Sequence, residues 1–408
     1  MSRLLQGIPF ALSLVFFLCA NYLQADVHSD FIELNESTSS KSSIAFSPDS
    51  TKILTGCADG VARIWNAETG EELLQFVGHA QVVGQPLRFK STVFSSDGKK
   101  VLTHATDNAR IWDVETGKEL HALEDGEKVS PHSAVFSPDG KKVATVVGLN
   151  PAEGNYLVRI WDAETGKVLR EFDRSVRASF SPDGKKIITI HQGGVIRVWD
   201  ADSGERLFDL AGHANGVFSA VFSPDGKMIL STSQDTTARI WDAETGRELQ
   251  RLYDHRNVLS WHASADSFSP DGKKVITTHY GEATGWYWDA DLERQVQKLS
   301  GHTCRVWDVE TGKELQQLVG HMRVVVYAAF LPDGKHIITR SEDQTVRLWD
   351  AGSGREVHVL KIERPLNFLP PAFSPDGKKL AVLDGMTARI WNLNALLPLT
   401  VQPVMRDF

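Results

Sequence analysis

The stretch that decides the fold runs from Val217 to Leu252 and reads VFSAVFSPDGKMILSTSQDTTARIWDAETGRELQRL. It divides into four short segments rich in β-forming residues, at 217–222, 228–233, 237–242 and 247–252. The Ser-Pro-Asp-Gly sequence between the first two suits a type I turn, with Pro fixing φ at the second position and Gly at the last. Short strands separated by turn signals predict an all-β unit of four strands.

This unit recurs along the chain. The aromatic residue before the turn returns as Phe46, Phe94, Phe136, Phe180, Phe222, Phe268, Phe330 and Phe373. The tryptophan of the third segment returns as Trp65, Trp112, Trp161, Trp199, Trp241, Trp288, Trp307, Trp349 and Trp391. A repeat of 42 to 48 residues over most of its length predicts an architecture built by adding like units.

Gly212-His213 before the first strand and Ile240-Trp241-Asp242 in the third make the unit resemble the WD-repeat (β-transducin-like) family. The resemblance covers about residues 28–394. It implies an all-β fold, a β-propeller of eight four-stranded blades around a channel. The units expected are 41–78, 88–125, 130–173, 175–211, 214–252, 258–300, 321–361 and 368–394.

One Trp is surplus to the eight turns. Phe268 and Phe330 are 62 residues apart, and both Trp288 and Trp307 lie between them. With Trp288 assigned to the sixth unit, residues 302–320 have a third and a fourth strand but no first or second. The sequence therefore predicts a truncated extra unit at 302–320, added to a blade as a hairpin.

The segment His28–Leu34 precedes the first unit. Leu34 lies 12 residues before Phe46, as Leu210 at the end of a fourth strand lies 12 residues before Phe222. We therefore expect this segment to be a fourth strand that completes the last blade and closes the ring. The tail 395–408 has no unit pattern and is the alternative source of that strand.

Residues 1–25 read as a secretory signal peptide, with Arg3 at the start, an apolar core at Ile8–Leu18 and small residues at Ala20 and Ala25. The mature protein is expected to be periplasmic or extracellular, without stable membrane insertion. An uncleaved anchor is the alternative. Export of a WD-repeat protein fits a bacterial setting better than a eukaryotic one.

Charge and cysteine usage limit the partners. The formal net charge is −8, without a basic run, which argues against nucleic acid as a partner. Of the three cysteines, Cys19 lies in the predicted signal peptide. Cys57 and Cys304 lie in well-separated units, so we expect no disulfide between them.

The resemblance also implies hydrogen-bonded structural tetrads, in which each buried polar group satisfies the next. Two sets share the same spacing, and a third has one residue fewer before the Trp. Their members are His213, Ser231, Asp235 and Trp241; His321, Thr339, Asp343 and Trp349; and His79, Thr103, Asp107 and Trp112.

Such a set could suggest a catalytic triad, but a triad occurs once, whereas these sets recur with the fold period. The spacing of His and acidic residues does not indicate a metal site, and no cofactor motif is present. We therefore expect a non-enzymatic scaffold for a protein or peptide partner. The alternatives are an exported propeller enzyme, either a quinone-dependent dehydrogenase or a lactonase-like enzyme, and a propeller that binds small ligands or glycans.

Partner binding is expected on the face formed by the loops that enter the first strands and join the second to the third. The chemically mixed residues there are Gln81, Thr106, Asn215, Gln234, Arg323 and Glu342. The sixth unit departs most from the repeat, with Trp261, His262, His279, Tyr280, Trp286 and Tyr287. Aromatic residues often anchor interfaces, so Trp261 with His262 is the expected hot spot. A core repacked around the truncated unit is the alternative.

Overall fold

The structure is a computed structural model. It describes residues 31–34, 40–80, 89–124, 131–150, 155–173, 175–191, 193–253, 258–259, 267–280, 285–289, 294–298, 303–362, 370–384 and 387–397. Residues 32–408 form one compact unit, which is described here by itself. The predicted signal peptide lies outside the described residues.

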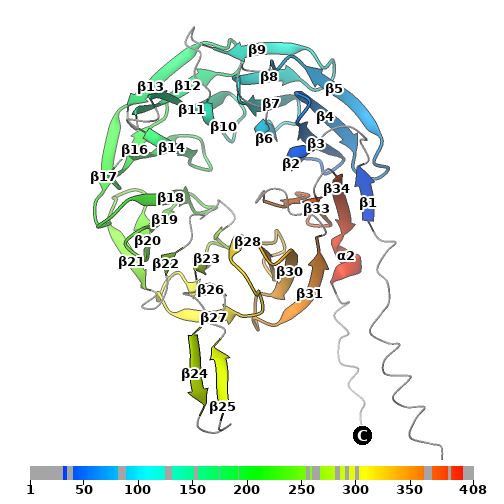
Figure 1. The fold of residues 1–408 in the computed structure, drawn as a ribbon. Helices are drawn as coiled ribbons and strands as arrows, with labels where there is room; N and C mark the ends of the chain where they lie inside the picture. The colour runs from blue at the N-terminus through cyan, green and yellow to red at the C-terminus, as the bar shows by residue number, and fades with distance from the viewer. Residues whose placement is uncertain are drawn as a thin grey trace, which may run out of the picture. The chain divides into compact units, whose positions relative to one another are not determined.

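The chain folds as a β-propeller of eight four-stranded blades, as the repeat predicts. Within the unit the first strands lie innermost and the fourth strands form the circumference (Figure 1). Blades 1 to 4 consist of β2 (Lys41–Phe46), β3 (Lys52–Cys57), β4 (Val61–Asn66) and β5 (Glu72–Val77); β6 (Phe89–Phe94), β7 (Lys100–Ala105), β8 (Ala109–Asp113) and β9 (Glu119–Leu123); β10 (Pro131–Phe136), β11 (Lys142–Asn150), β12 (Asn155–Asp162) and β13 (Val168–Asp173); and β14 (Ser175–Phe180), β15 (Lys186–His191), β16 (Ile196–Asp200) and β17 (Arg206–Leu210).

Blades 5 to 8 follow in chain order except where the sixth is interrupted and the eighth is closed. They consist of β18 (Val217–Phe222), β19 (Met228–Ser233), β20 (Thr237–Asp242) and β21 (Glu248–Tyr253); β22 (Val258–Leu259), β23 (Lys274–Tyr280), β26 (Thr303–Asp308) and β27 (Glu314–Leu318); β28 (Val325–Phe330), β29 (His336–Ser341), β30 (Thr345–Asp350) and β31 (Glu356–Lys361); and β32 (Ala372–Phe373), β33 (Lys379–Asp384), β34 (Thr387–Asn392) and β1 (Phe31–Leu34).

The Ser-Pro-Asp-Gly turn forms as its residues predict. In blade 5 the N–H of Gly226 donates to the carbonyl of Ser223 at 2.9 Å, and Gly226 has φ of 72°. The Ser223 hydroxyl donates to Asp225 at 2.6 Å and accepts from the N–H of Met228 at 2.9 Å. A left-handed φ of this size favours glycine, which explains why the turn ends on Gly in every blade except the first, where Ser50 adopts φ of 63°.

The apolar core lies between blades rather than within them. Seven clusters of buried side chains each join two neighbouring blades of the described structure. In one, Trp241 and Phe222 of blade 5 pack against Ile188, Ile190 and Leu210 of blade 4. Both faces of each sheet are thus covered, which accounts for adjacent apolar residues such as Ile240 and Trp241.

Ion pairs repeat between neighbouring blades at the circumference. A lysine at the start of a second strand pairs with an acidic residue in the outer turn of the following blade, as in Lys100–Glu164 at 2.7 Å and Lys186–Glu244 at 2.6 Å. Lys142–Asp202 and Lys379–Glu68 have the same arrangement. These exposed pairs each contribute little stability, about 0–1 kcal/mol. The outer-turn acids Glu68, Glu164 and Glu244 therefore contact the preceding blade.

The sixth blade corrects the prediction for residues 258–320. Its third and fourth strands are β26 and β27, which come from the segment expected to be an appendage. The two-stranded sheet outside the blades is instead β24 (Gly285–Asp289) with β25 (Arg294–Lys298), which projects from the ring (Figure 1). The number of blades is nevertheless eight, since β26 and β27 enter the sixth blade and β24 and β25 do not form a blade of their own.

Side-chain size explains which pair enters the blade. The residue before the third-strand Trp is buried in every blade, as Val306 and Ile240 show with 0% exposure. The competing segment has Tyr287 at that position, and a tyrosine there would overfill the space and bury a hydroxyl. In addition, Asp308 accepts from the N–H and hydroxyl of Thr311, and Gly312 has φ of 67°. The segment after Asp289 has Leu292 and Glu293 where this turn needs Thr and Gly.

The eighth blade is completed by β1, which lies next to β34. Leu34 of β1 is fully buried and packs with Ile390 of blade 8 and with Phe46 and Trp65 of blade 1. After β34 the chain forms the short helix α2 (Leu393–Leu396), whose Leu393 and Leu396 are buried. Within the described residues the strand next to β34 is therefore β1 and not the tail, of which residues 398–408 lie outside the description. The helices in the described structure include none that is long and apolar enough to cross a membrane.

Candidate functional site: the loop face and the channel pocket

The tetrad of blade 5 forms a continuous chain of hydrogen bonds. Nδ1 of His213 lies 2.9 Å from Oδ2 of Asp235, and its Nε2 lies 2.7 Å from Oγ of Ser231. The indole N–H of Trp241 donates to the same hydroxyl at 2.8 Å. The hydrogen-bonding groups of Ser231 and Trp241 are thus used inside the blade.

The other two sets form the same chain. In blade 7, His321 lies 2.9 Å from Asp343 and 2.7 Å from Thr339, to which Trp349 donates at 2.8 Å. In blade 2, the corresponding distances are 2.6 Å from His79 to Asp107, 2.7 Å from His79 to Thr103 and 2.7 Å from Trp112 to Thr103. The shorter spacing before Trp112 does not prevent the bonds. In blades without the histidine the Trp still donates to a threonine, as Trp65 does to Thr55 at 2.8 Å.

The electrostatics of these groups follow from burial and hydrogen bonding. Burial works to raise the pKa of Asp235, but hydrogen bonds from Thr237, from the backbone N–H of Ala214 and from His213 outweigh it, so the pKa lies well below its ordinary value. Asp343 has a lowered pKa for the same reasons, with His321 and Thr345 as partners. Burial lowers the pKa of His213, although the Asp235 carboxylate favours its charged form. The aspartates are therefore charged at neutral pH and accept hydrogen bonds.

The tetrad aspartates also tie two loops together. Oδ2 of Asp235 accepts from the N–H of Ala214 at 3.0 Å, in the loop that enters the first strand. Asp235 itself lies in the loop between the second and third strands, and its Oδ1 accepts from the N–H of Thr237, the first residue of the third strand, at 3.0 Å. Asp343 makes the same link to Met322 at 2.9 Å, and Asp107 to Ala80 at 2.9 Å. We call the surface formed by these two kinds of loop the loop face.

Several residues expected to bind a partner lie on the loop face. Asn215 and Gln234 are exposed and adjacent in blade 5, where the N–H of Gln234 donates to Gly216 at 2.9 Å. In blade 7, Arg323 is exposed and Glu342 half-buried, and the N–H of Glu342 donates to Val324 at 2.9 Å. Thr106 of blade 2 is half-buried and precedes the tetrad Asp107. Blades 5 and 7 thus each bring their two loops together.

The structure does not describe the expected aromatic hot spot. Trp261, His262 and Gln81 lie outside the described residues. The other aromatic residues of the expected cluster fall in two sheets, because His279 and Tyr280 belong to β23 of blade 6, whereas Trp286 and Tyr287 belong to β24 of the projecting hairpin. The sixth unit is therefore not a single repacked blade.

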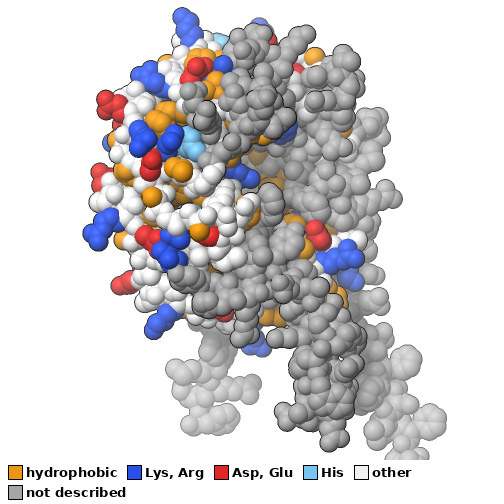
Figure 2. Space-filling view, turned by 60° about the vertical axis from the view of Figure 1, so that its left-hand side comes forward, with side chains coloured by type: hydrophobic (Ala, Val, Ile, Leu, Met, Phe, Trp, Pro, Cys, Tyr) orange, Lys and Arg blue, Asp and Glu red, His pale blue; other side chains and the backbone are white. Residues whose placement is uncertain are grey.

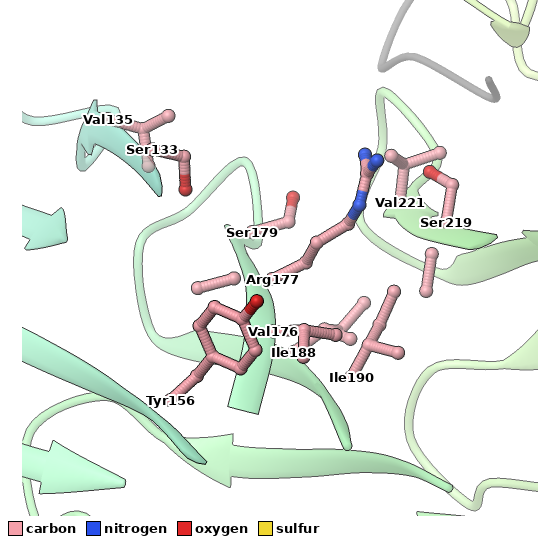
Figure 3. A pocket seen from close by; sticks show the side chains of 12 residues that line it. Ser133, Val135, Tyr156, Val176, Arg177, Ser179, Ile188, Ile190, Ser219 and Val221 are labelled. Carbon is pink, nitrogen blue, oxygen red and sulfur yellow. The ribbon is translucent and has the colours of Figure 1, made fainter. Parts of the chain in front are cut away.

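A cavity of about 500 Å³ lies between the inner strands of blades 3, 4 and 5. Its lining includes Arg177, the hydroxyl residues Ser133, Tyr156, Ser179 and Ser219, and apolar side chains such as Ile188 and Ile190. Figure 3 shows the Arg177 guanidinium extending toward Ser219 and Val221 of blade 5, with Ser133 across the cavity. We call this cavity the channel pocket.

Arg177 was not among the residues predicted from the sequence, although the repeat marks it as an exception. Three residues before the turn aromatic, blades 1, 2, 3 and 5 have a serine, namely Ser43, Ser91, Ser133 and Ser219. Two of these serines bond to the next blade, Ser43 to Thr92 at 3.0 Å and Ser91 to the carbonyl of Ala134 at 3.5 Å. Blade 4 has Arg177 there, which the interface between blades does not require.

Other features of the described structure give weaker indications of a binding site. A second cavity, of about 460 Å³, is mainly apolar and is lined by turn residues such as Pro224, Pro270, Pro332 and Pro375. Among the residues that the structure covers, no group of three or more His, Cys, Asp or Glu side chains is placed to hold a metal ion. Figure 2 shows acidic and basic side chains interspersed over one side of the ring.

Comparisons with known proteins agree with this fold. The family described as "WD domain, G-beta repeat" matches residues 31–66, 204–242 and 312–350. The first match begins at β1, the other two begin two residues before a fourth strand, and each ends in the third strand of the next blade. The matches support the resemblance to WD-repeat propellers.

Individual relatives are distant. WD repeat-containing protein 1 from Xenopus tropicalis is 25% identical over 43% of this chain and 29% of its own length, and that from Gallus gallus is 24% identical over 49% and 33%. The chain thus spans about a third of the length of these relatives. A serine-threonine kinase receptor-associated protein from Dictyostelium discoideum is 27% identical over 84% of this chain and 91% of its own length. The C-terminal WD40 domain of Sif2 superposes with a TM-score of 0.68 at 18% identity, over 88% of this chain and 98% of that domain.

Proposed function

We propose that the protein is a non-enzymatic interaction scaffold that binds a protein or peptide partner on the loop face. The observation that carries this proposal is the link made by Asp235 and Asp343 between the two loops of their blades. The link holds the exposed residues Asn215, Gln234 and Arg323 on fixed backbone. A surface ordered in advance loses little entropy on binding, which favours its use for recognition.

The hydrogen bonds within the tetrads support a non-enzymatic role. Each histidine already contacts an aspartate on one side and a hydroxyl on the other, and that hydroxyl also accepts from a Trp. A nucleophile must be free to reach a substrate, whereas Ser231 is fully buried. These sets therefore stabilise blades.

The test is affinity capture from a native extract with the purified mature chain. Arg323→Glu reverses a charge on the loop face, and Lys335→Glu reverses one on the same blade at the turn after the first strand, toward the opposite face. Proteins that bind through the loop face should be lost with Arg323→Glu and retained with Lys335→Glu. Trp261→Ala should weaken such binding by about 2 kcal/mol or more if Trp261 is the hot spot. Equal capture by folded wild-type and Arg323→Glu proteins would contradict the proposal for this region.

We also propose that the scaffold is exported, with residues 1–25 acting as a signal peptide, and that it works in a bacterial periplasm or outside the cell. Expression of the full chain in a bacterial host tests this. Cell fractionation should place the protein in the periplasm, and its intact mass should correspond to a chain that begins at Asp26. A full-length protein in the cytoplasmic fraction would be evidence against export.

A further inference from the structure

The channel pocket contains a cation, Arg177, that has no partner among the residues the structure describes. Arg177 has no hydrogen bond or ion pair with any residue in the described ranges, and burial alone lowers the pKa of its guanidinium. Its side chain keeps contact with water through the pocket, and arginine stays protonated at neutral pH. An exposed guanidinium that lines a cavity and has no carboxylate beside it is available to pair with an anion that enters the cavity.

A second arginine provides the contrast. Arg340 of blade 7 is buried, unlike the solvent-exposed Arg177, and burial lowers its pKa. However, the carboxylate of Asp384 in blade 8 favours the charged form of Arg340. Asp384 also accepts from Arg389 at 2.8 Å. The fold therefore supplies a carboxylate where a buried arginine serves structure, and the described residues supply none to Arg177.

The remaining lining suits a small oxyanion. The hydroxyls of Ser133 and Ser179 face the cavity and have no hydrogen-bond partner in the described part of the chain. Hydroxyl groups can donate to carboxylate or phosphate oxygens, and the planar guanidinium can donate two parallel hydrogen bonds to either. The apolar wall formed by Ile188 and Ile190 would exclude water from one side and strengthen those bonds.

We propose that the channel pocket binds an anionic group of a partner peptide, a carboxylate or a phosphate, through the guanidinium of Arg177 with the hydroxyls of Ser133 and Ser179. This inference rests on the proposed function, and it assigns the chemistry of the partner. A protein with net charge −8 would then recognise an acidic ligand through one local cation rather than through a basic surface.

The decisive variant is Arg177→Ser, which installs the residue that blades 1, 2, 3 and 5 already have. It should fold with an unchanged or higher melting temperature, because it removes an unpaired charge. Arg177→Lys keeps the charge but loses the paired donors and should bind an anion with intermediate affinity. A large loss of stability in Arg177→Ser would instead make Arg177 a structural residue and overturn the proposal.

Anion binding is measured on the mature chain by thermal melting, with sodium phosphate or sodium acetate titrated at constant ionic strength. At least one anion should raise the wild-type melting temperature saturably, and Arg177→Ser should lower the apparent affinity at least tenfold. Whether phosphate or acetate raises the melting temperature shows whether the partner's anionic group is a phosphate or a carboxylate. Equal shifts in the wild type and Arg177→Ser, or no shift in either, would refute the pocket.

Phenylglyoxal labelling gives an independent readout. Arg177 should be modified, and the effective anion should protect it, while Arg340 beside Asp384 should stay unmodified. Affinity capture then tests the link to a partner, since proteins held by the loop face should be lost from Arg177→Ser. Unchanged capture would overturn the peptide part of the proposal. If wild-type protein captures nothing that depends on Arg323, the proposed function fails. The anion titration by thermal melting still tests whether the channel pocket binds an anion.

Discussion

Trp307 donates its indole N–H to the hydroxyl of Thr277 at 2.8 Å, although 30 residues separate them in the chain. In blade 5 the equivalent bond joins Ser231 and Trp241, which are 10 residues apart. The same contact is kept in blade 6 because β24 and β25 leave the blade and return the chain to it. The hairpin is therefore an insertion into a complete blade.

Deleting residues 282–301 should leave the propeller folded, because it restores the 10-residue spacing between Thr277 and Trp307. Its melting temperature should lie within a few degrees of the wild type. The matched control is deletion of 303–318, which removes β26 and β27 and should destabilise the protein strongly, even if β24 and β25 replace them with Tyr287 in the core. The reverse order of stabilities would restore the assignment of 302–320 as the appendage.

His213→Ala should destabilise the protein by about 1–3 kcal/mol, because Asp235 and Ser231 would lose a buried hydrogen-bond partner. Denaturant unfolding measures the change. His121→Ala is the control, since His121 forms a hydrogen bond with the carbonyl of Glu164 near the surface and its loss should cost less. An unchanged stability together with a lost activity would support a catalytic role for the tetrad instead.

The free energy of unfolding of the protein should fall as the pH decreases from about 7.5 to 5.5, because of His213 in blade 5. Burial lowers the pKa of His213 in the folded state, so the unfolded chain takes up a proton near its ordinary value of 6.5 while the folded chain does not. The stabilisation from neutral His213 is complete above that value and is lost as the pH falls toward the folded pKa. Unfolding free energies at both pH values should show a steeper decrease for the wild type than for His213→Ala. Equal slopes would mean that His213 does not titrate differently on folding.

Leu34→Ala should destabilise the protein by about 2–5 kcal/mol, because Leu34 is fully buried between the last and first blades. Leu249 lies on the fourth strand of blade 5 and is 49% exposed, so Leu249→Ala is the matched control and should change stability little. Thermal unfolding of the mature variants distinguishes them. If both substitutions cost equally little, β1 does not contribute to closing the ring.

Cys57 and Cys304 should not react with a thiol reagent in the native protein. Neither forms a disulfide and both are buried, and burial raises the pKa of the Cys304 thiol far above its ordinary value. A thiolate is the reactive form, so little of it is present at neutral pH. Absorbance of the released reagent anion should appear only after denaturant is added. Rapid native labelling would show that one of the two blade interfaces opens.

The repeat made the fold predictable, whereas the exceptions to it were harder to interpret. The spacing of Leu34 from Phe46 indicated a strand outside any unit, and the structure places β1 beside β34. The sixth blade was assigned wrongly because Trp288 comes first in the chain. The information that decides between Trp288 and Trp307 lies in their neighbours, Tyr287 against Val306 and Leu292 against Thr311. Those neighbours matter through side-chain volume and turn geometry, which a repeat period does not measure.

The site was less predictable than the fold. The tetrads could be identified because each of their residues recurs, and residues on the loop face because their loops recur. Arg177 occurs once, and its importance depends on the absence of a nearby carboxylate among the described residues, a property of three blades packed together. A comparison of the residue three positions before the turn aromatic in each unit would have identified Arg177 as an exception, because four other units have serine there.

The strands that close the ring come from opposite ends of the described chain, β1 at residues 31–34 and β34 at 387–392. A mechanical force that pulls these ends apart would act first on the hydrogen bonds between these two strands, before it reached any other blade. The ring would then open at the eighth blade and the remaining blades would unravel in turn. Anchoring the protein through its ends would therefore make blade 8 the point of mechanical failure, whereas anchoring it through a loop of another blade would leave that closure unloaded.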